Sequence, residues 1–97
     1  MLEQNYPNPF RTATFIKYTV PSESNDGFDQ HLVKLRVMDA LGTQVALLVN
    51  GYQHPGSYEI RFDAQSVKDF QDLPVGVYYY KLTIDHLVFT NKMILLK

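Results

Sequence analysis

The sequence contains no cysteine, and this absence excludes several kinds of site. Without thiols the chain has no disulfide framework, no thiolate zinc site and no cysteine nucleophile, although the compartment stays open because exported proteins need not carry disulfides. An excess of charge of one sign is missing too: the net charge is -1, and Lys and Arg form no run. Neither nucleic acid nor an anionic membrane surface is therefore expected as a partner.

Long hydrophobic runs are also missing. No apolar stretch approaches the ~18 residues of a membrane-spanning helix, so direct membrane insertion is not expected. The first residues lack the basic and then apolar pattern of a signal peptide, so the targeting information of an exported chain would precede this sequence. Met1 stands just before the proline-rich segment that opens at Asn5, which suggests a fragment of a larger protein whose N-terminal cargo is missing.

What is present indicates one globular domain over residues 1–97. Hydrophobic residues make up 45% of the chain and charged residues 20%, which is the composition of a folded protein rather than of a disordered one. A chain of this length buries roughly 60–65% of its unfolded surface, enough for one core but not for a second domain.

Apolar and polar residues alternate with period two almost everywhere, and this pattern predicts strands. The expected strands cover residues 16–20, 33–37, 45–49, 58–62, 78–84, 87–90 and 93–96, while residues 64–71 form a connector able to hold a short helical turn. The inward-facing side chains are expected to be Ile16, Tyr18, Val20, Val33, Leu35, Val37, Val45, Leu47, Val49, Tyr58, Ile60, Phe62, Tyr78, Tyr80, Leu82 and Ile84. About seven short antiparallel strands predict an all-β fold, an immunoglobulin-like Greek-key β-sandwich.

Turn signals separate the predicted strands. Asp39 and Gly42 favour a type I turn with a bulge, because Asp39 can bond forward to the backbone and Gly42 can take the left-handed conformation. Asn50-Gly51 gives a second turn signal, and Asp85-His86 the turn of the final hairpin. A leucine, a glycine and Tyr78 within residues 73–78 have the spacing of a tyrosine corner, in which the phenol bonds back to the backbone.

The sequence contains almost no pattern typical of a catalytic, metal-binding or phosphate-binding site. The three histidines, His31, His54 and His86, lie in or beside separate loops with no carboxylate at metal-ligand spacing. The acidic loop of Glu23, Asp26 and Asp29 does not fit an EF-hand, because Val33 stands where the last acid is required. No serine stands in a nucleophile elbow, and no glycine-rich phosphate loop occurs. We therefore expect no catalytic residue, no metal site and no cofactor, and the chain is not expected to be an enzyme.

The tyrosine cluster leaves two interpretations open. Alternation places Tyr79 on the opposite face from Tyr78 and Tyr80. With Tyr52 or Phe89 it would form an exposed aromatic platform for sugar stacking. The alternative is that Tyr79 packs on a neighbouring strand, as its β-propensity favours.

Four segments carry a resemblance to a known family. They are Asn5-Tyr6-Pro7-Asn8-Pro9-Phe10, Val37-Met38-Asp39-Ala40-Leu41-Gly42-Thr43-Gln44-Val45, Gly76-Val77-Tyr78-Tyr79-Tyr80-Lys81-Leu82 and Lys92-Met93-Ile94-Leu95-Leu96-Lys97. In order and spacing they resemble the successive signatures of the type IX (Por) secretion system C-terminal sorting domain, type A. The resemblance covers essentially the whole chain and implies a fold similar to the immunoglobulin-like domain of hook-capping proteins.

The resemblance also implies a function, that of a non-catalytic secretion signal at the end of a larger exported protein. Its partners would be the outer-membrane type IX translocon with its shuttle components, and a sortase-like signal peptidase that removes the domain. The cargo would pass through the periplasm and be secreted or attached to the cell surface. By position, Asn5–Phe10 would follow the cargo linker, Gly76, Val77 and Tyr78 would form the internal signature, and Lys92–Lys97 the terminal signal strand. That strand would offer its receptor either a side-chain pattern or a sheet edge.

The sequence departs from the family pattern in three places. The loop at residues 22–31 is longer than usual, Met38 stands where an aromatic residue is common, and Phe62 stands where tryptophan is frequent. Two other functions remain open for the same fold. A carbohydrate-binding or adhesive module of a secreted enzyme predicts an exposed, coplanar aromatic pair, whereas a structural spacer predicts that no receptor depends on the terminal strand.

Overall fold

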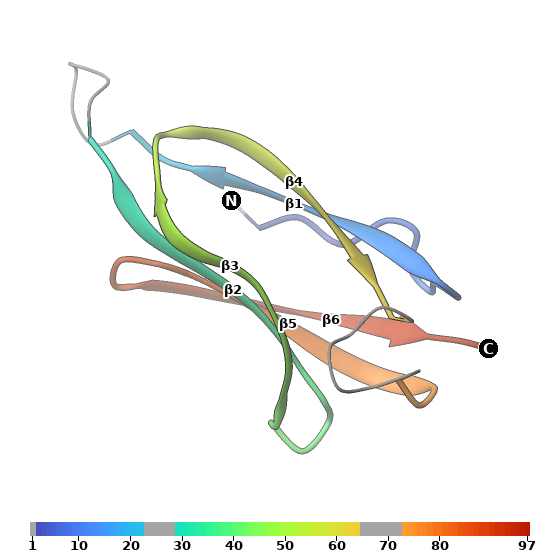
Figure 1. The fold of residues 1–97 in the computed structure, drawn as a ribbon. Helices are drawn as coiled ribbons and strands as arrows, with labels where there is room; N and C mark the ends of the chain where they lie inside the picture. The colour runs from blue at the N-terminus through green and yellow to red at the C-terminus, as the bar shows by residue number, and fades with distance from the viewer. Residues whose placement is uncertain (1, 23–28, 65–72) are drawn as a thin grey trace.

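The computed structural model describes residues 2–22, 29–64 and 73–97, and its regular structure consists of six antiparallel strands in two sheets (Figure 1). The strands are β1 (Ala13–Val20), β2 (His31–Met38), β3 (Gln44–Gln53), β4 (Gly56–Asp63), β5 (Gly76–Ile84) and β6 (Leu87–Leu95). β1 and β4 form a two-stranded sheet, and the other four form a sheet in the order β3-β2-β5-β6. The all-β sandwich is confirmed.

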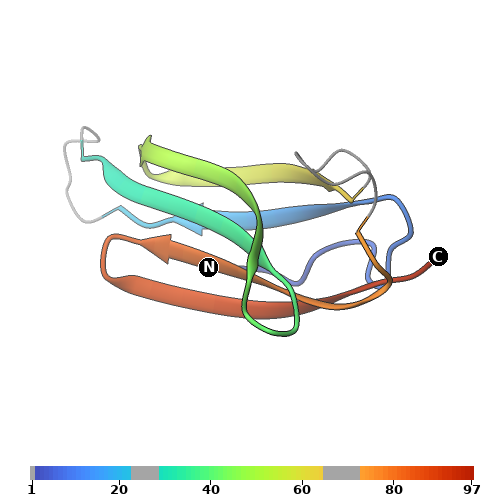
Figure 2. The ribbon, with the colours of Figure 1, turned by 60° about the horizontal axis from the view of Figure 1, so that its bottom comes forward.

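The two sheets lie in two layers around one core (Figure 2). The chain crosses between the layers after β1, β3 and β4, which places the non-consecutive strands β2 and β5 side by side, as in a Greek-key order. Alternate residues of each strand point inward because successive side chains of a strand face opposite sides. The largest fully buried side chains are Tyr18, Tyr80, Phe10, Phe62, Ile16, Leu35, Leu82, Ile84, Met93, Val20, Val33 and Val37.

The sequence predicted about seven strands, and the last two are in fact one. β6 pairs with β5 without interruption from Leu87 opposite Ile84 to Leu95 opposite Gly76. Two adjacent polar residues, Asn91 and Lys92, interrupt the apolar pattern without interrupting the strand, since both pair with β5. The predicted turn at Asp85-His86 is correct, and Asp85 takes a positive φ of 52°, a conformation that Asp tolerates.

β3 departs from simple alternation. Two register shifts against β2 insert extra residues, so that Arg36 pairs with Leu47 but Leu35 with Val49. Each extra residue turns the following side chains to the other face of the sheet. Leu47 is consequently 47% exposed, and its predicted inward position is wrong. The second predicted turn, Asn50-Gly51, is also wrong: both residues lie inside β3 and pair with β2.

Two predicted turns are confirmed in atomic detail. The carboxylate of Asp39 accepts hydrogen bonds from the N–H groups of Leu41 and Thr43, both 2.9 Å, and Gly42 takes a φ of +88°. The hydroxyl of Tyr78 donates to the carbonyl of Pro74 at 2.5 Å, which is the back-bond of a tyrosine corner. Burial and then the negative charge of Asp39 raise the pKa of Tyr78, so its hydroxyl keeps its proton.

Some sequence predictions fall outside the described residues. These are most of the 22–31 loop, including Glu23 and Asp26 of the acidic loop, and the helical turn expected at residues 64–71, of which Ala64 alone is described. Among the described residues, no helix is long and apolar enough to cross a membrane.

His31 lies between two carboxylates, a contact that sequence reasoning missed. Its Nδ1 lies 2.5 Å from Asp85 Oδ2, and its Nε2 lies 3.0 Å from Asp29 Oδ2. An imidazolium satisfies both contacts, because only the charged ring donates from both nitrogens. Asp85 also accepts a hydrogen bond from the N–H of Leu32 at 3.0 Å, so the cluster fixes the start of β2 to the β5–β6 turn.

This cluster predicts a pH-dependent contribution to stability. The hydrogen bond from His31, followed by that from the Leu32 N–H, lowers the pKa of Asp85 in the folded state. A carboxyl group with a lowered folded pKa stabilises the fold above its unfolded pKa of about 3.9, and loses this effect as the pH falls through the folded value. Asp85→Asn should therefore lower the urea midpoint at pH 7, with a difference from the parent that shrinks below about pH 4. A constant difference across that range would contradict this account.

Candidate functional site

The N-terminal motif, residues Asn5–Phe10, begins along the free edge of β1. The N–H of Glu3 donates to the carbonyl of Lys17 at 3.0 Å, and Tyr6 and Phe15 exchange two backbone hydrogen bonds of 3.0 and 2.9 Å. Leu2 makes a further antiparallel bridge with Tyr18. The segment before β1 thus continues the two-stranded sheet on the side opposite β4.

The same motif then pairs with the free edge of β6. The N–H of Phe10 donates to the carbonyl of Ile94 at 3.0 Å, and the N–H of Leu96 donates to the carbonyl of Phe10 at 2.8 Å. The side chain of Asn8 accepts from the N–H of Ile94 at 3.0 Å. In Figure 1 this segment runs between β1 and β6 towards the C-terminal end of the chain. We call this double contact the seam.

Asn5 is the buried centre of the motif, with 2% of its surface exposed. Its side-chain nitrogen, Nδ2, donates to the carbonyl of Pro7 at 3.2 Å and to the hydroxyl of Thr14 at 3.0 Å. Thr14, fully buried in β1, donates in turn to the carbonyl of Pro7 at 2.8 Å. The peptide bonds before Pro7 and Pro9 are both cis. These contacts fold the motif back on itself against β1.

Tyr80 of β5 connects the motif to the four-stranded sheet from inside the core. Its hydroxyl donates to the carbonyl of Glu3 at 2.7 Å and accepts from the N–H of Asn5 at 2.8 Å and the Asn91 amide at 3.2 Å. Burial raises the pKa of Tyr80, and the hydrogen bonds from Asn91 and Asn5 lower it in part. The neutral phenol is the form that donates to Glu3, so the shift favours the seam.

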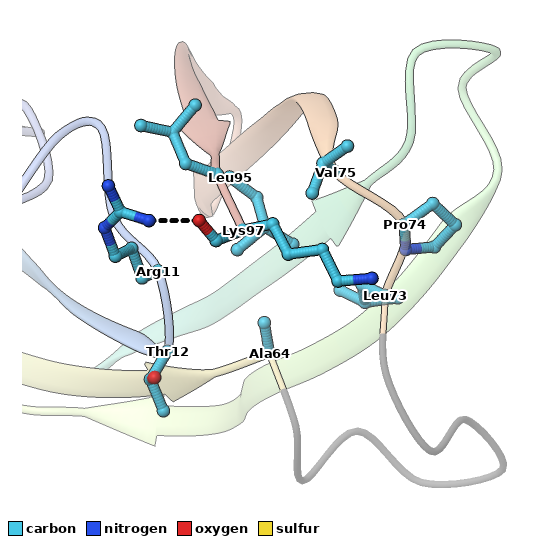
Figure 3. Close-up of a pocket in the computed structure, with 9 residues that line it drawn as sticks. Arg11, Thr12, Ala64, Leu73, Pro74, Val75, Leu95 and Lys97 are labelled. Carbon is cyan, nitrogen blue, oxygen red and sulfur yellow. Dashed lines mark hydrogen bonds between the residues drawn. The ribbon is translucent and has the colours of Figure 1, made fainter.

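A pocket of about 420 Å³ opens where the seam ends (Figure 3). Its lining comes from four parts of the chain: Arg11, Thr12, Ala64, Leu73, Pro74, Val75, Leu95, Leu96 and Lys97. The guanidinium of Arg11 donates to the carbonyl of Lys97, which ties the residues after β6 to those after the N-terminal motif. Next to Arg11 in the chain, Phe10 packs edge-on against Phe62 of β4, with ring centroids 6.2 Å apart.

The structure brings the three predicted signature segments together. Gly76, Val77 and Tyr78 pair directly with Leu95, Ile94 and Met93, and the N-terminal motif pairs with the other edge of the same strand. The Asp39–Gly42 turn lies apart from the seam, beside Tyr79 in a second hollow of about 420 Å³.

The predicted site residues divide into buried and exposed sets. Asn5, Phe10, Tyr78, Met93 and Leu95 are buried, whereas the other side chains of the N-terminal motif and Val77, Lys92, Leu96 and Lys97 are exposed, and Gly76 and Ile94 are half-buried. Arg11, Thr14, Tyr80 and Asn91 also build the seam but were not predicted as site residues. No local pattern reveals them, because their partners lie 7 to 88 residues away.

The aromatic platform is not formed. Phe89 pairs with Leu82 and packs against the core, on the opposite face of the sheet from Tyr79. Tyr52 pairs with Leu32 and Tyr79 with Met38, so the two tyrosines stand six β2 positions apart, about 20 Å by strand geometry. Within residues 2–22, 29–64 and 73–97, no three acidic or histidine side chains converge as metal ligands.

The Tyr80 hydroxyl offers a direct test of the seam. Tyr80→Phe removes one hydroxyl and leaves the Asn5 N–H without this partner in a buried position. An unsatisfied buried group of this kind costs about 1–3 kcal/mol, so the free energy of unfolding from urea titration should fall by that amount. Tyr79→Phe, which changes a neighbouring exposed tyrosine, is the matched control and should leave it nearly unchanged. Equal losses in both variants would contradict the role of the hydroxyl.

Comparison with known proteins identifies the family of the chain. The family model described as the secretion system C-terminal sorting domain matches residues 4–96, which include the N-terminal motif and every residue of the other signature segments except Lys97. No curated protein and no solved structure matches the chain. Domains of this family are non-catalytic secretion signals, and the cargo that carries them interacts with the secretion machinery and is secreted or displayed on the cell surface. The chain therefore belongs to the C-terminal sorting domains of the Por, or type IX, secretion system.

Proposed function

We propose that this single domain ends a larger exported protein and acts as a folded sorting signal, recognised at the surface where the N-terminal motif and Lys92–Lys97 meet. The receptor is the outer-membrane type IX translocon with its shuttle components, which binds the cargo protein in the periplasm. A sortase-like signal peptidase then removes the domain at the linker before the motif. The observation that carries this proposal is that both ends of the matched family segment share one seam.

The seam limits the ways in which a receptor could recognise the terminal strand. A free edge strand would offer its backbone for strand addition, but the N-terminal motif already bonds to Ile94 and Leu96, and Gln4 Nε2 donates to the carbonyl of Lys92 at 2.8 Å. The remaining option is a side-chain pattern. In this proposal the buried residues of the signature segments hold the shape, and the exposed ones contact the receptor.

Four exposed side chains are suited to that contact. Tyr6 of the N-terminal motif is 79% exposed and Leu96, just after β6, is 41% exposed. Lys92 in β6 and Lys97 after it are exposed too. Large apolar side chains ringed by polar groups are typical of protein interaction sites. Basic side chains add orientation through their charge. The proposed contact is thus a mixed apolar and basic strip along the seam.

Deleting Lys92–Lys97 from a cargo fusion should leave the cargo in the periplasm. The deletion removes the exposed strip and the backbone groups that hold Phe10 and Asn8. Immunoblots of periplasm and medium report both location and size, so they also show whether the domain is removed from exported cargo. Normal export of the truncated fusion would refute the proposed function.

A point substitution at an exposed position distinguishes loss of receptor recognition from loss of folding. Leu96→Ser should reduce export while the thermal midpoint stays nearly unchanged, since exposed substitutions usually alter stability by less than about 0.5 kcal/mol. Leu87→Ser is the matched control, because Leu87 begins β6 and is 43% exposed against 41% for Leu96. The control fusion should be exported like the parent. Equal export of both variants would exclude Leu96 from the contact.

A further inference from the structure

The outer face of the four-stranded sheet is basic. Lys34 and Arg36 of β2, Lys81 of β5 and Lys92 of β6 stand on it, since the residues that flank each of them include buried core residues such as Leu35, Tyr80 and Met93. None of the four strands contains an Asp or a Glu. We call these four residues the basic face. A chain of net charge -1 thus concentrates positive charge on one sheet.

The positive charges lie close together. Arg36 pairs directly with Lys81, and Lys92 pairs with Tyr79, one diagonal step from Lys81. Diagonal neighbours in a sheet are about 7–8 Å apart along the backbone, so each residue of the face has another basic residue as a direct or diagonal neighbour. Like charges directly opposite one another destabilise a sheet. The pair of Arg36 and Lys81 therefore opposes folding rather than supporting it.

No ion pair in the described part of the chain includes any of these four residues. The carboxylate of Asp39 lines the hollow that Tyr79 and Lys81 also line, but the turn holds it through the N–H groups of Leu41 and Thr43. The two-stranded sheet differs, because there Lys17 pairs with Glu59 at 3.7 Å and Arg61 with Asp63 at 3.2 Å.

Exposed apolar side chains lie between the basic ones. Leu47 pairs with Arg36 and is 47% exposed, Tyr79 is 37% exposed, and Val88 is 55% exposed beside Thr83. A face that mixes uncompensated cations with apolar side chains fits a partner surface of carboxylates around apolar groups, because opposite potentials attract and the apolar area leaves water.

We propose that the basic face docks on an acidic protein surface of the secretion machinery. This inference rests on the proposed function and adds a second contact to the seam. The four residues lie on three neighbouring strands, across about 10 Å by strand spacing and about 13 Å by strand rise. An area of this size is smaller than a stable interface and suits a transient contact that adds to the seam.

The structure favours a protein over a lipid surface. Lys34, Arg36 and Lys81 are half-buried, so their stems are packed against neighbours on a rigid sheet. Such a fixed pattern matches a fixed array of carboxylates and loses little side-chain freedom on binding. The exposed apolar side chains between the cations, Leu47, Tyr79 and Val88, stand in strands at the level of the cations, and the exposed Leu41 lies in the adjoining turn.

The test compares two double variants of the cargo fusion with identical changes in charge. Arg36→Gln with Lys81→Gln removes two charges from the basic face, and Arg61→Gln with Lys17→Gln removes the same two residue types from the other sheet. The first variant should release about fivefold less cargo into the medium, because lost charge complementarity slows association. The second should be exported like the parent. Equal export of the two variants would overturn the inference.

Stability and lipid binding complete the design. Removing a like-charge pair should leave the thermal midpoint of the Arg36→Gln/Lys81→Gln fusion equal to or above that of the parent at low salt, so a large drop in midpoint would overturn the account of the face. Sedimentation with vesicles of phosphatidylglycerol and phosphatidylcholine tests the lipid alternative. Charge-dependent vesicle binding of the parent would overturn the choice of a protein partner. Failure of the parent fusion itself to be exported would instead refute the proposed function.

Discussion

The hydrogen bonds between the N-terminal motif and the two strands β1 and β6 are the constraint on which the rest of the structure depends. Without them β1 and the C-terminal part of β6 would present open edges, and the two sheets would lose hydrogen bonds that add to their apolar contacts, to the crossing loops and to the bond from the Tyr18 hydroxyl to Gln53. The motif satisfies both edges at once, and the buried polar groups of Asn5, Thr14 and Tyr80 bond to one another and to its backbone. A polar network that is satisfied in this way fixes one arrangement of the sheets.

The seam also explains why two distant parts of the sequence act as one signal. Phe10 and Ile94 lie at opposite ends of the chain, so their bond forms only when the strands between them are in place. Contacts of such large sequence separation carry a high cost in loop-closure entropy before they stabilise the fold. On the proposed function, a receptor that reads the seam therefore reads a finished domain and passes over an unfolded one.

Local patterns predicted much of the fold because local physics decides those features. The period-two alternation located most strands, and Asp39 with Gly42 located a turn whose geometry those two residue types favour. The misses arise where tertiary contacts override local pattern. Leu47 faces outward because β-bulges shift the register against β2, and Asn91 continues β6 because its amide has a partner in Tyr80. The seam residues Arg11 and Thr14 could not be found in advance, since their partners are set by the packing of whole sheets.

The net charge of the chain does not reveal the cluster of basic residues on the four-stranded sheet, which follows from the order and register of the strands. The net charge of -1 argued against a basic surface, yet strand pairing segregates the charges. Acids pair with Lys17 and Arg61 on one sheet, whereas no acid of the described residues forms an ion pair with Arg36 or Lys81 on the other. A sequence selected for stability alone would place an acid opposite Arg36, since opposite charges across a strand pair are favourable. Local arrangements that oppose folding are expected where a protein has another use for the residues. The Arg36 and Lys81 pair is such a place on the outer face of the four-stranded sheet, and Lys92 belongs both to this face and to the proposed contact at the seam.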